Sequence, residues 1–224
     1  MLKNFETNLN ELKSIISNMA NLVEEQLNLA ICELERGEAN EHKLIKTRDK
    51  EINAYENLVL AKCETIFAKF QPVAKELRTI IAVIKINNQL ERCGDIAVNI
   101  SQKVKKSQQA KDLLLDAKIQ QLAKFSIQMV NDAIKAFMNE DLELAKKVLE
   151  NEKVVDKNSK ENFNFLVEKM KYSPDIIEAG AQLIVLIRQL ERLADHATNI
   201  AEDVYFVVEN QIIAHNKKDL FNKD

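Results

Sequence analysis

Apolar side chains recur every three or four positions along almost the whole chain, which is the spacing of one face of an α-helix. The chain has only three Gly and two Pro, too few for the frequent turns of a β-rich fold. Gly37 follows an apolar-periodic run and is expected to end the first helix. The pattern predicts six long helices, at about 4–35, 39–69, 72–106, 112–138, 141–171 and 174–214.

The chain contains an internal duplication. Residues 89–100 read QLERCGDIAVNI and residues 189–200 read QLERLADHATNI, which match at Gln, Leu, Glu, Arg, Asp, Ala, Asn and Ile. Short connections make neighbouring helices antiparallel. The sequence therefore predicts an all-α protein of two tandem three-helix bundles, residues 1–107 and 108–224, with six long antiparallel helices related by internal duplication. The stretch 105–111 is the only candidate boundary, and it lacks the composition of a linker.

The first halves of the third and sixth helices are apolar on nearly every side. The residues are Leu77, Ile80, Ile81, Val83, Ile84 and Ile86 in the third helix, and Ile177, Leu183, Ile184, Leu186 and Ile187 in the sixth. A helix that is apolar all round is buried all round. We expect the two bundles to pack through these segments, and a homodimer interface is the alternative.

Composition and charge exclude several classes of function. The net charge of −3 provides no basic surface for nucleic acid. The longest uncharged stretch, 14–23, is far shorter than the roughly twenty residues of a spanning helix, so no membrane insertion is expected. The first residues lack the apolar core of an export signal. Cys32, Cys63 and Cys93 are widely spaced and odd in number, as is typical of reduced thiols in a cytoplasmic protein.

Two sets of polar residues lie off the core stripe of the third and sixth helices. They are Glu91, Asp95 and Asn99 in the third helix, and Glu191, Asp195 and Asn199 in the sixth. At about 100° per residue they fall roughly opposite the core stripe, which in the third helix begins with Leu90 and Cys93. These side chains are therefore predicted to line an outer face of each bundle.

The second and fifth helices carry a further pair each. Asp49 and Asn53 are one helical turn apart, as are Glu152 and Asp156. If the second helix lies beside the third in each unit, acidic and amide side chains converge between them. Oxygen donors of this kind suit Mg²⁺, Ca²⁺, Mn²⁺ or iron, and Zn²⁺ less readily. His196 offers a nitrogen donor in the second unit alone. The plainer alternative is a solvated helix face.

No catalytic constellation is found in the sequence. It has no glycine-rich phosphate loop, no Gly-x-Ser-x-Gly and no His-Glu-x-x-His motif. Cys93 lies on the core stripe, where a packed thiol is expected in place of a nucleophile. We therefore expect no catalytic or cofactor-binding residues and no enzymatic activity.

The order and spacing of these features resemble the PhoU family, the accessory proteins of bacterial phosphate uptake. The likeness covers essentially the whole chain. Its motifs are Phe5-x-x-x-Leu9, Leu22-Val23-Glu24-x-Gln26-Leu27, Asp49-x-x-Ile52-Asn53, Phe70-Gln71-Pro72, Leu77-Arg78, Leu90-Glu91-Arg92-x-Gly94-Asp95, Glu152-x-x-Val155-Asp156 and Glu191-Arg192-x-x-Asp195-His196-x-x-Asn199-Ile200.

The resemblance implies a cytoplasmic negative regulator of phosphate uptake and phosphate-starvation signalling. Such proteins connect the ATPase subunit of the phosphate ABC transporter to a sensor histidine kinase. The alternative function is a carboxylate-rich metal-binding protein with a storage or redox role.

The resemblance also implies candidate metal ligands, because some family members bind multinuclear iron or zinc clusters on their acidic faces, while others are metal-free. Mg²⁺ and Mn²⁺ remain alternatives here. The matching residues are Glu91, Asp95, Glu191 and Asp195, with Asp49, Asn53, Glu152 and Asp156 beside them. Ala194 stands where the family usually has glycine, and we expect this difference to weaken the second site.

Overall fold

The computed structural model describes residues 2–107 and 111–213. Every regular element in this part of the chain is a helix. The elements are α1 (Leu2–Arg36), α2 (His42–Phe70), α3 (Ala74–Lys106), α4 (Lys111–Asp116), α5 (Ile119–Asn139), α6 (Leu142–Tyr172), the 3-10 turn η2 (Pro174–Ile176) and α7 (Ile177–Val208). The boundary predicted between residues 107 and 108 falls at positions 108–110, which lie outside the described residues.

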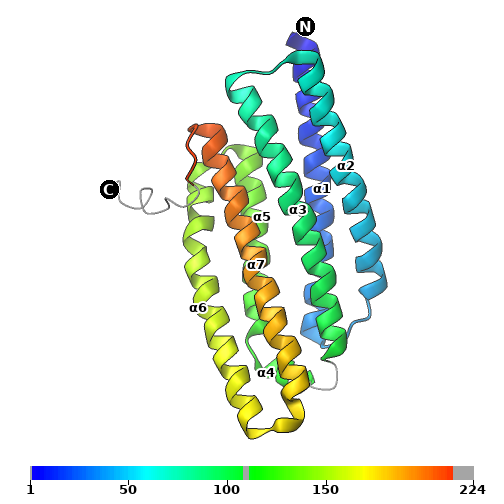
Figure 1. The fold of residues 1–224 in the computed structure, drawn as a ribbon, viewed down its shortest axis with the longest axis vertical. Helices are drawn as coiled ribbons and strands as arrows, with labels where there is room; N and C mark the ends of the chain where they lie inside the picture. The colour runs from blue at the N-terminus through cyan, green and yellow to red at the C-terminus, as the bar shows by residue number, and fades with distance from the viewer. Residues whose placement is uncertain (1, 108–110, 214–224) are drawn as a thin grey trace, which may run out of the picture.

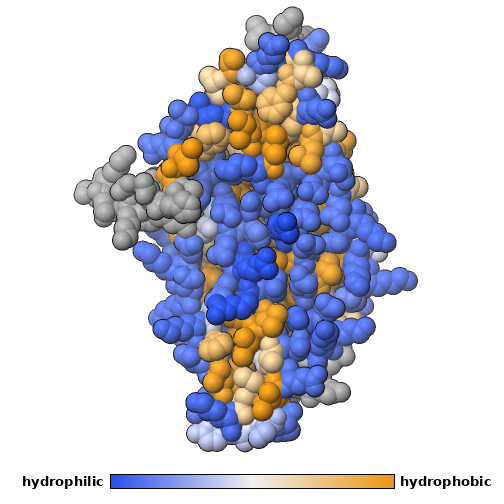
Figure 2. Space-filling model, in the orientation of Figure 1, coloured by the Kyte–Doolittle hydropathy of each residue, from blue (hydrophilic) through white to orange (hydrophobic). Residues whose placement is uncertain are grey.

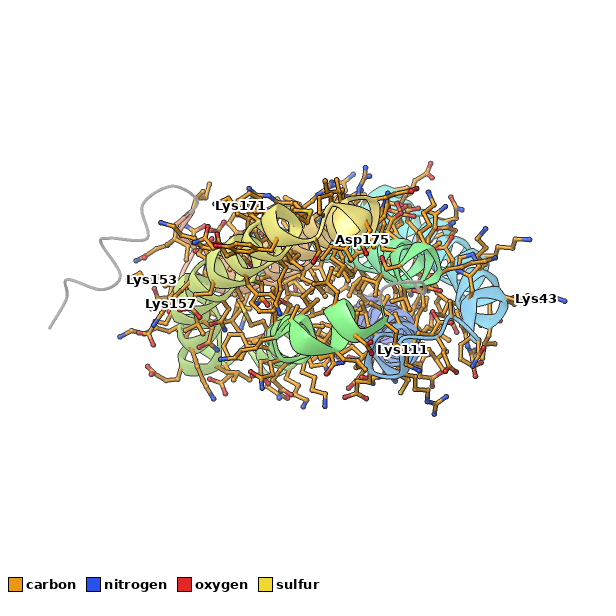
Figure 3. The ribbon with its side chains drawn as sticks, turned by 90° about the horizontal axis from the view of Figure 1, so that it is seen from below. Lys43, Lys111, Lys153, Lys157, Lys171 and Asp175 are labelled. Atoms are coloured by element: carbon orange, nitrogen blue, oxygen red, sulfur yellow. The ribbon has the colours of Figure 1, made fainter. Side chains whose placement is uncertain are left out.

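The helices form two bundles that lie side by side (Figure 1). We call α1, α2 and α3 the first repeat, and α5, α6 and α7 the second. The bundles meet where α3 packs along α7 and α1 packs against α5. Seen end-on, Lys43 of α2 and Lys153 and Lys157 of α6 point outward from opposite edges of the molecule (Figure 3). The predicted fold, tandem three-helix bundles from an internal duplication, is confirmed.

Most helix ends fall close to their predicted positions, and Gly37 ends α1 with a left-handed φ of 64° as expected. The start of α3 differs. The predicted third helix includes Pro72 in its first turn, but α2 continues to Phe70, and Gln71, which follows it, takes a left-handed conformation with a φ of 48°. Pro72 then lies in the connection, and α3 begins at Ala74.

The predicted helix at 112–138 is broken into α4 and α5. Ala117 and Ile119 flank the break and are both buried. Two positions of one straight helix that are two residues apart point to nearly opposite sides, so a single helix could not bury both against one core. The break at Lys118 lets both side chains pack as the chain crosses between bundles.

The predicted helix at 174–214 is shorter at both ends. A 3-10 turn precedes it, and α7 ends at Val208. Asn210 takes a left-handed conformation with a φ of 56°, which turns the chain back so that Ile213 is only 5% exposed. Residue 214 lies outside the described residues.

The core stripes agree with the sequence analysis. The stripe of α3 that begins with Leu90 and Cys93, and the equivalent stripe of α7, are fully buried; the residues are Leu90, Cys93, Ala97, Ile100 and Val104, and Leu190, Leu193, Ala197, Ile200 and Val204. None of the described helices combines the length and apolar character that crossing a membrane requires.

The prediction that the bundles pack through α3 and α7 is confirmed, with one correction. The two helices run antiparallel, so their apolar first halves do not meet, and each lies against the second half of the other. The contacts that define this register are Lys85 with Asp203, Gln89 with His196 (2.6 Å) and Lys103 with Gln182 (3.0 Å). The apolar first halves also keep exposed side chains, including Ile177 (51%) and Val185 (40%), so the expectation that they are buried on every side is wrong.

Candidate functional site

The acidic residues of the first repeat gather between α2 and α3. We call Asp49, Asn53, Glu91 and Asp95 the first acidic seam. Burial raises the pKa of Asp49, and the charge of Asp95 raises it further. Burial also raises the pKa of Glu91, with repulsion from Asp95 and weaker contributions from Glu56 and Asp49. The three carboxylates on the two helices therefore lie within electrostatic reach of one another.

The remaining member of this seam, Asn53, is half-buried, and its backbone carbonyl accepts a hydrogen bond from Asn57 (2.9 Å). Arg92 provides a positive charge beside the seam, with its Nε 3.6 Å from Glu91. Within residues 2–107 and 111–213, no group of three or more His, Cys, Asp or Glu side chains is placed to hold a metal ion. The seam concentrates negative charge, and metal binding there stays a prediction.

Gln26 of α1 supports the first seam from behind, and the sequence analysis did not select it as a site residue. Its side chain is fully buried, and its Nε2 donates to the carbonyl of Ile45 at 3.0 Å. A hydrogen bond from Gln26 to Asp49 opposes the rise in the pKa of that carboxyl group. A β-carbon on Gly94 would lie 3.1 Å from both Gln26 Oε1 and Ile52 Cδ1. Glycine at 94 therefore makes room for this buried amide.

The corresponding residues of the second repeat are arranged differently. We call Glu152, Asp156, Glu191 and Asp195 the second acidic seam. Glu191 faces α6 across a groove and forms an ion pair with Arg188 at 2.6 Å. Glu152 is half-buried, whereas Asp156 and Asp195 are exposed. Glu191 thus has a strong local counter-charge.

His196 points across the α3–α7 contact. Its Nδ1 lies 2.6 Å from Gln89 Oε1, which also accepts from Asn199 at 3.3 Å. Burial lowers the pKa of His196 to about 4, and the charges of Arg192 and Arg92 act in the same direction. The imidazole is therefore neutral at physiological pH and tied to the other bundle.

Cys93 is a packed thiol, as the sequence analysis expects. Cys93 is fully buried, and burial raises its pKa far above the ordinary range. Cys63 is also buried, which raises its pKa to about 11. Neither is available as a thiolate nucleophile at neutral pH.

Comparison with known proteins identifies what the two bundles share. The sequence model of the PhoU domain matches residues 16–104 and again residues 119–204. The chain belongs to the PhoU family. The two matched stretches lie in α1–α3 and α5–α7, so each bundle carries one PhoU domain.

Full-length relatives and solved structures agree with this assignment. The "phosphate-specific transport system accessory protein PhoU homolog 1" of Thermotoga maritima is 32% identical over 204 residues, 91% of this chain and 88% of that protein. The PhoU protein of Escherichia coli K12 is 28% identical over 98% of this chain and 91% of its own length. The crystal structure of PhoU from Pseudomonas aeruginosa superposes with a TM-score of 0.86 at 30% identity, covering 92% of this chain and 100% of that one.

Proposed function

We propose that this PhoU protein is a cytoplasmic negative regulator of phosphate uptake and phosphate-starvation signalling. It acts as an adaptor that contacts the ATPase subunit of the phosphate ABC transporter and a sensor histidine kinase. The observation that carries the proposal is the match of both bundles, nearly end to end, to proteins named as phosphate transport accessory proteins. A phosphate transport role follows from that match, and the regulatory direction and the two partners go further.

The structure supports an adaptor that works by contact, without catalysis. Cys63 and Cys93 are buried, and His196 is neutral and hydrogen-bonded to Gln89. The two acidic seams gather carboxylate side chains on the outside of the bundle cores. Such seams can receive basic side chains of a partner by charge complementarity.

A deletion strain tests the regulatory proposal. With abundant phosphate, we expect phosphate-starvation genes to be switched on in the deletion strain and repressed again when the intact gene is returned. Transcript levels of the transporter genes are the readout. Normal repression in the deletion strain would overturn the proposal.

The partners are tested separately by affinity purification from cells grown in high and in low phosphate. The ATPase subunit and the sensor kinase should each be recovered with the tagged chain in at least one condition. If the chain regulates expression but recovers neither protein, the adaptor mechanism is wrong although the regulatory role stands.

A second candidate function is metal binding, and the first acidic seam specifically favours it. Burial and mutual repulsion raise the pKa of both Asp49 and Glu91, which is the condition that a bound cation relieves. As placed here these side chains do not form a metal-binding group. We propose that side-chain rotation would bring Asp49, Glu91 and Asp95, with Asn53 beside them, around a hard or borderline cation such as iron or Mn²⁺, or Zn²⁺. The second seam has Arg188 against Glu191 and is the weaker candidate.

Metal content tests this second candidate. The chain is equilibrated with each metal in turn, desalted and measured by elemental mass spectrometry. The variant Asp49→Asn/Glu91→Gln/Asp95→Asn should lose the bound metal, and the matched variant Glu152→Gln/Glu191→Gln/Asp195→Asn should keep most of it. Metal retained by the first variant would contradict the proposed site, and a redox or storage role would further require that the bound metal be essential for function.

A further inference from the structure

The pair of helices at the centre of the molecule has an approximate two-fold axis. Positions that correspond lie one hundred residues apart in α3 and α7 and 103 residues apart in the outer helices of the two repeats, and α3 and α7 are antiparallel. Lys85 contacts Asp203 near one end of the pair, and Lys103 contacts Gln182 near the other. Equivalent residues in the middle of the two helices therefore lie near the axis. Arg92 and its counterpart Arg192 are such a pair.

One side of this helix pair is open to solvent. The other sides of α3 pack on α1 and α2, and those of α7 pack on α5 and α6. Figure 1 shows α3 and α7 at the front of the molecule between α2 and α6. We call this exposed side the α3–α7 face. The axis lies in the middle of this face. A side chain that the first repeat places on one half of the face therefore has an equivalent position, from the second repeat, on the other half.

Apolar side chains gather at both ends of the α3–α7 face, with a hydrophilic band between them (Figure 2). At one end, Ile81, Phe206 and Ile212 line a groove of about 230 Å³. At the other, Phe163 and Ile184 line a groove of about 240 Å³ between α6 and α7. From the helical rise, the levels of Ile84 and Ile184, which are equivalent positions, lie roughly 28 Å apart along the face.

The apolar ends also contain matched positions on the outer helices and at the starts of α3 and α7. Leu60 of α2 is 41% exposed, and its counterpart in α6, Phe163, is 38% exposed. Leu77 is half-buried at the start of α3, and its counterpart Ile177 is 51% exposed. Isolated exposed apolar residues are ordinary, but equivalent ones in two repeats form two similar patches on one face.

The charged residues between the two apolar patches are arranged about the same approximate two-fold axis. Arg92 and Arg192 lie near the axis, and both act on His196, which lies between the two helices. The two acidic seams lie on either side of them, one toward α2 and the other toward α6. From the axis outward, the face therefore carries the two arginines and then the carboxylates of the two seams, of which Glu191 is paired with Arg188, with apolar patches at its two ends.

We propose that the α3–α7 face binds a partner that is itself a two-fold symmetric dimer, with one copy of this chain for each partner dimer. The partner presents acidic side chains at its own axis, basic side chains beside them and an apolar element on each subunit. Since this inference rests on the proposed function, the occupant is the pair of ATPase subunits of the phosphate transporter. One chain then contacts both subunits through equivalent patches.

A second copy of the same chain fits this face less well. Two such faces placed axis to axis would bring Arg92 and Arg192 of one copy against the same arginines of the other. Like charges opposed at the centre of an interface disfavour the contact. A dimeric partner with acidic groups at its axis has no such conflict. It also engages both patches at once, which strengthens binding without any new type of contact.

The stoichiometry of the complex tests the inference. The ATPase subunit is held in its closed, paired state with ATP and a hydrolysis-deficient substitution, then mixed with an excess of this chain. Size-exclusion chromatography with light scattering should give a complex of one chain with two ATPase subunits. Complexes with one chain on each subunit would overturn the inference and leave the adaptor function intact. Absence of any complex would overturn both.

Matched variants test whether both patches take part. Leu60→Glu and Phe163→Glu each place a charge in one patch at equivalent, partly exposed positions. Each should weaken binding to the paired ATPase roughly ten- to a hundred-fold, and the double variant should abolish it. Leu58→Glu and Val154→Glu are the controls, because these residues are similarly exposed (50% and 42%) on the opposite sides of the same helices.

The outcomes are distinct once circular dichroism shows that all four variants are folded. Loss caused by both face variants and by neither control supports the inference. Loss caused by only one face variant shows an off-axis contact and overturns it. Unchanged binding in both, or a complex in which a dimeric sensor kinase occupies this face and excludes the ATPase pair, overturns it as well.

Discussion

The two acidic seams repeat one motif, Glu-x-x-x-Asp, in two different electrostatic settings. In the second repeat, Arg188 lies one helical turn before Glu191 and pairs with it at 2.6 Å. The corresponding residue before Glu91 is Asn88, which has no charge to offer. Burial and neighbouring carboxylates then raise the pKa of Glu91. The charge balance of such a seam is set by its neighbours, so two copies of a motif need not bind the same ligand.

A second difference lies beneath the seams. Gln26 reaches Asp49 from α1, and Gly94 leaves room for its amide. At the corresponding positions the second repeat has Met129 and Ala194, both buried and apolar or small. The first seam therefore stands on a hydrogen-bonded support, and the second stands on an apolar one. We expect the first seam to be the more selective of the two, because Gln26 holds the carboxylate of Asp49 in place.

The largest expected effect is a loss of stability on substituting core residues that the two repeats share. Leu90 and Leu190 occupy equivalent, fully buried core positions. Leu90→Ala and Leu190→Ala should each lower the free energy of unfolding by about 2–5 kcal/mol, because each leaves a cavity. Urea denaturation followed by circular dichroism measures both. Each variant should still unfold in one transition, since α3 and α7 pack on each other. A separate transition for one repeat would show that the halves are independent.

The second-largest expected effect is on the pH dependence of stability. It concerns His196, which stands in the second repeat where the first has Ile96. Its pKa is lowered to about 4, so folding favours the neutral ring. The resulting stability is fully present above the unfolded pKa of about 6.5 and is lost as the pH falls toward 4. Between pH 7.5 and pH 5, the wild-type chain should lose about 1 kcal/mol more than His196→Gln, with partial solvent exposure limiting the effect. Denaturation curves at the two pH values decide this. Equal losses would contradict a neutral, buried His196.

The smallest expected change in the free energy of unfolding has opposite signs in the two seams. At pH 7, Glu91→Gln should stabilise the fold by roughly 0.5 kcal/mol, because it removes repulsion from Asp95. Glu191→Gln should destabilise it by a similar amount, because it breaks the pair with Arg188. The pKa of Glu91 is raised, so its destabilising charge is present at neutral pH and disappears as the pH falls toward the unfolded value.

Thermal and urea unfolding at pH 7 and pH 4 measure both substitutions. The gain from Glu91→Gln should vanish at pH 4, where the wild-type side chain is itself largely protonated. Changes of the same sign at pH 7 would contradict the comparison of the two seams.

The helices and the core could be predicted because their signal is local and periodic. Leu90 and Cys93 lie on the same side of any helix that contains them, whatever packs against it. The break at Lys118 could not be predicted, because it depends on Ala117 and Ile119 both finding the core at a crossing between bundles. The position of Pro72 depends in a similar way on Gln71, whose left-handed conformation after the end of α2 leaves Pro72 in the connection.

Some features of the candidate site could likewise be predicted from the sequence, and others could not. That Glu91 and Asp95 share a face, and lie near Asp49, follows from helical spacing and a hairpin between neighbouring helices. Gln26 was missed as a site residue, although one signal was present: it is a polar residue within the apolar stripe that contains Val23 and Leu27. The direction of His196 depends on the register between α3 and α7, which no local pattern encodes.

The antiparallel contact between α3 and α7 has a consequence for how such a chain arises. A single repeat that pairs with a copy of itself through this helix would have true two-fold symmetry, and each mutation would appear at both ends of the contact. Fusion of two gene copies removes that constraint. One end could then acquire the Lys85–Asp203 ion pair, while the equivalent positions at the other end became Val185 and Lys103. The difference between the two ends records divergence that only a fused duplication permits.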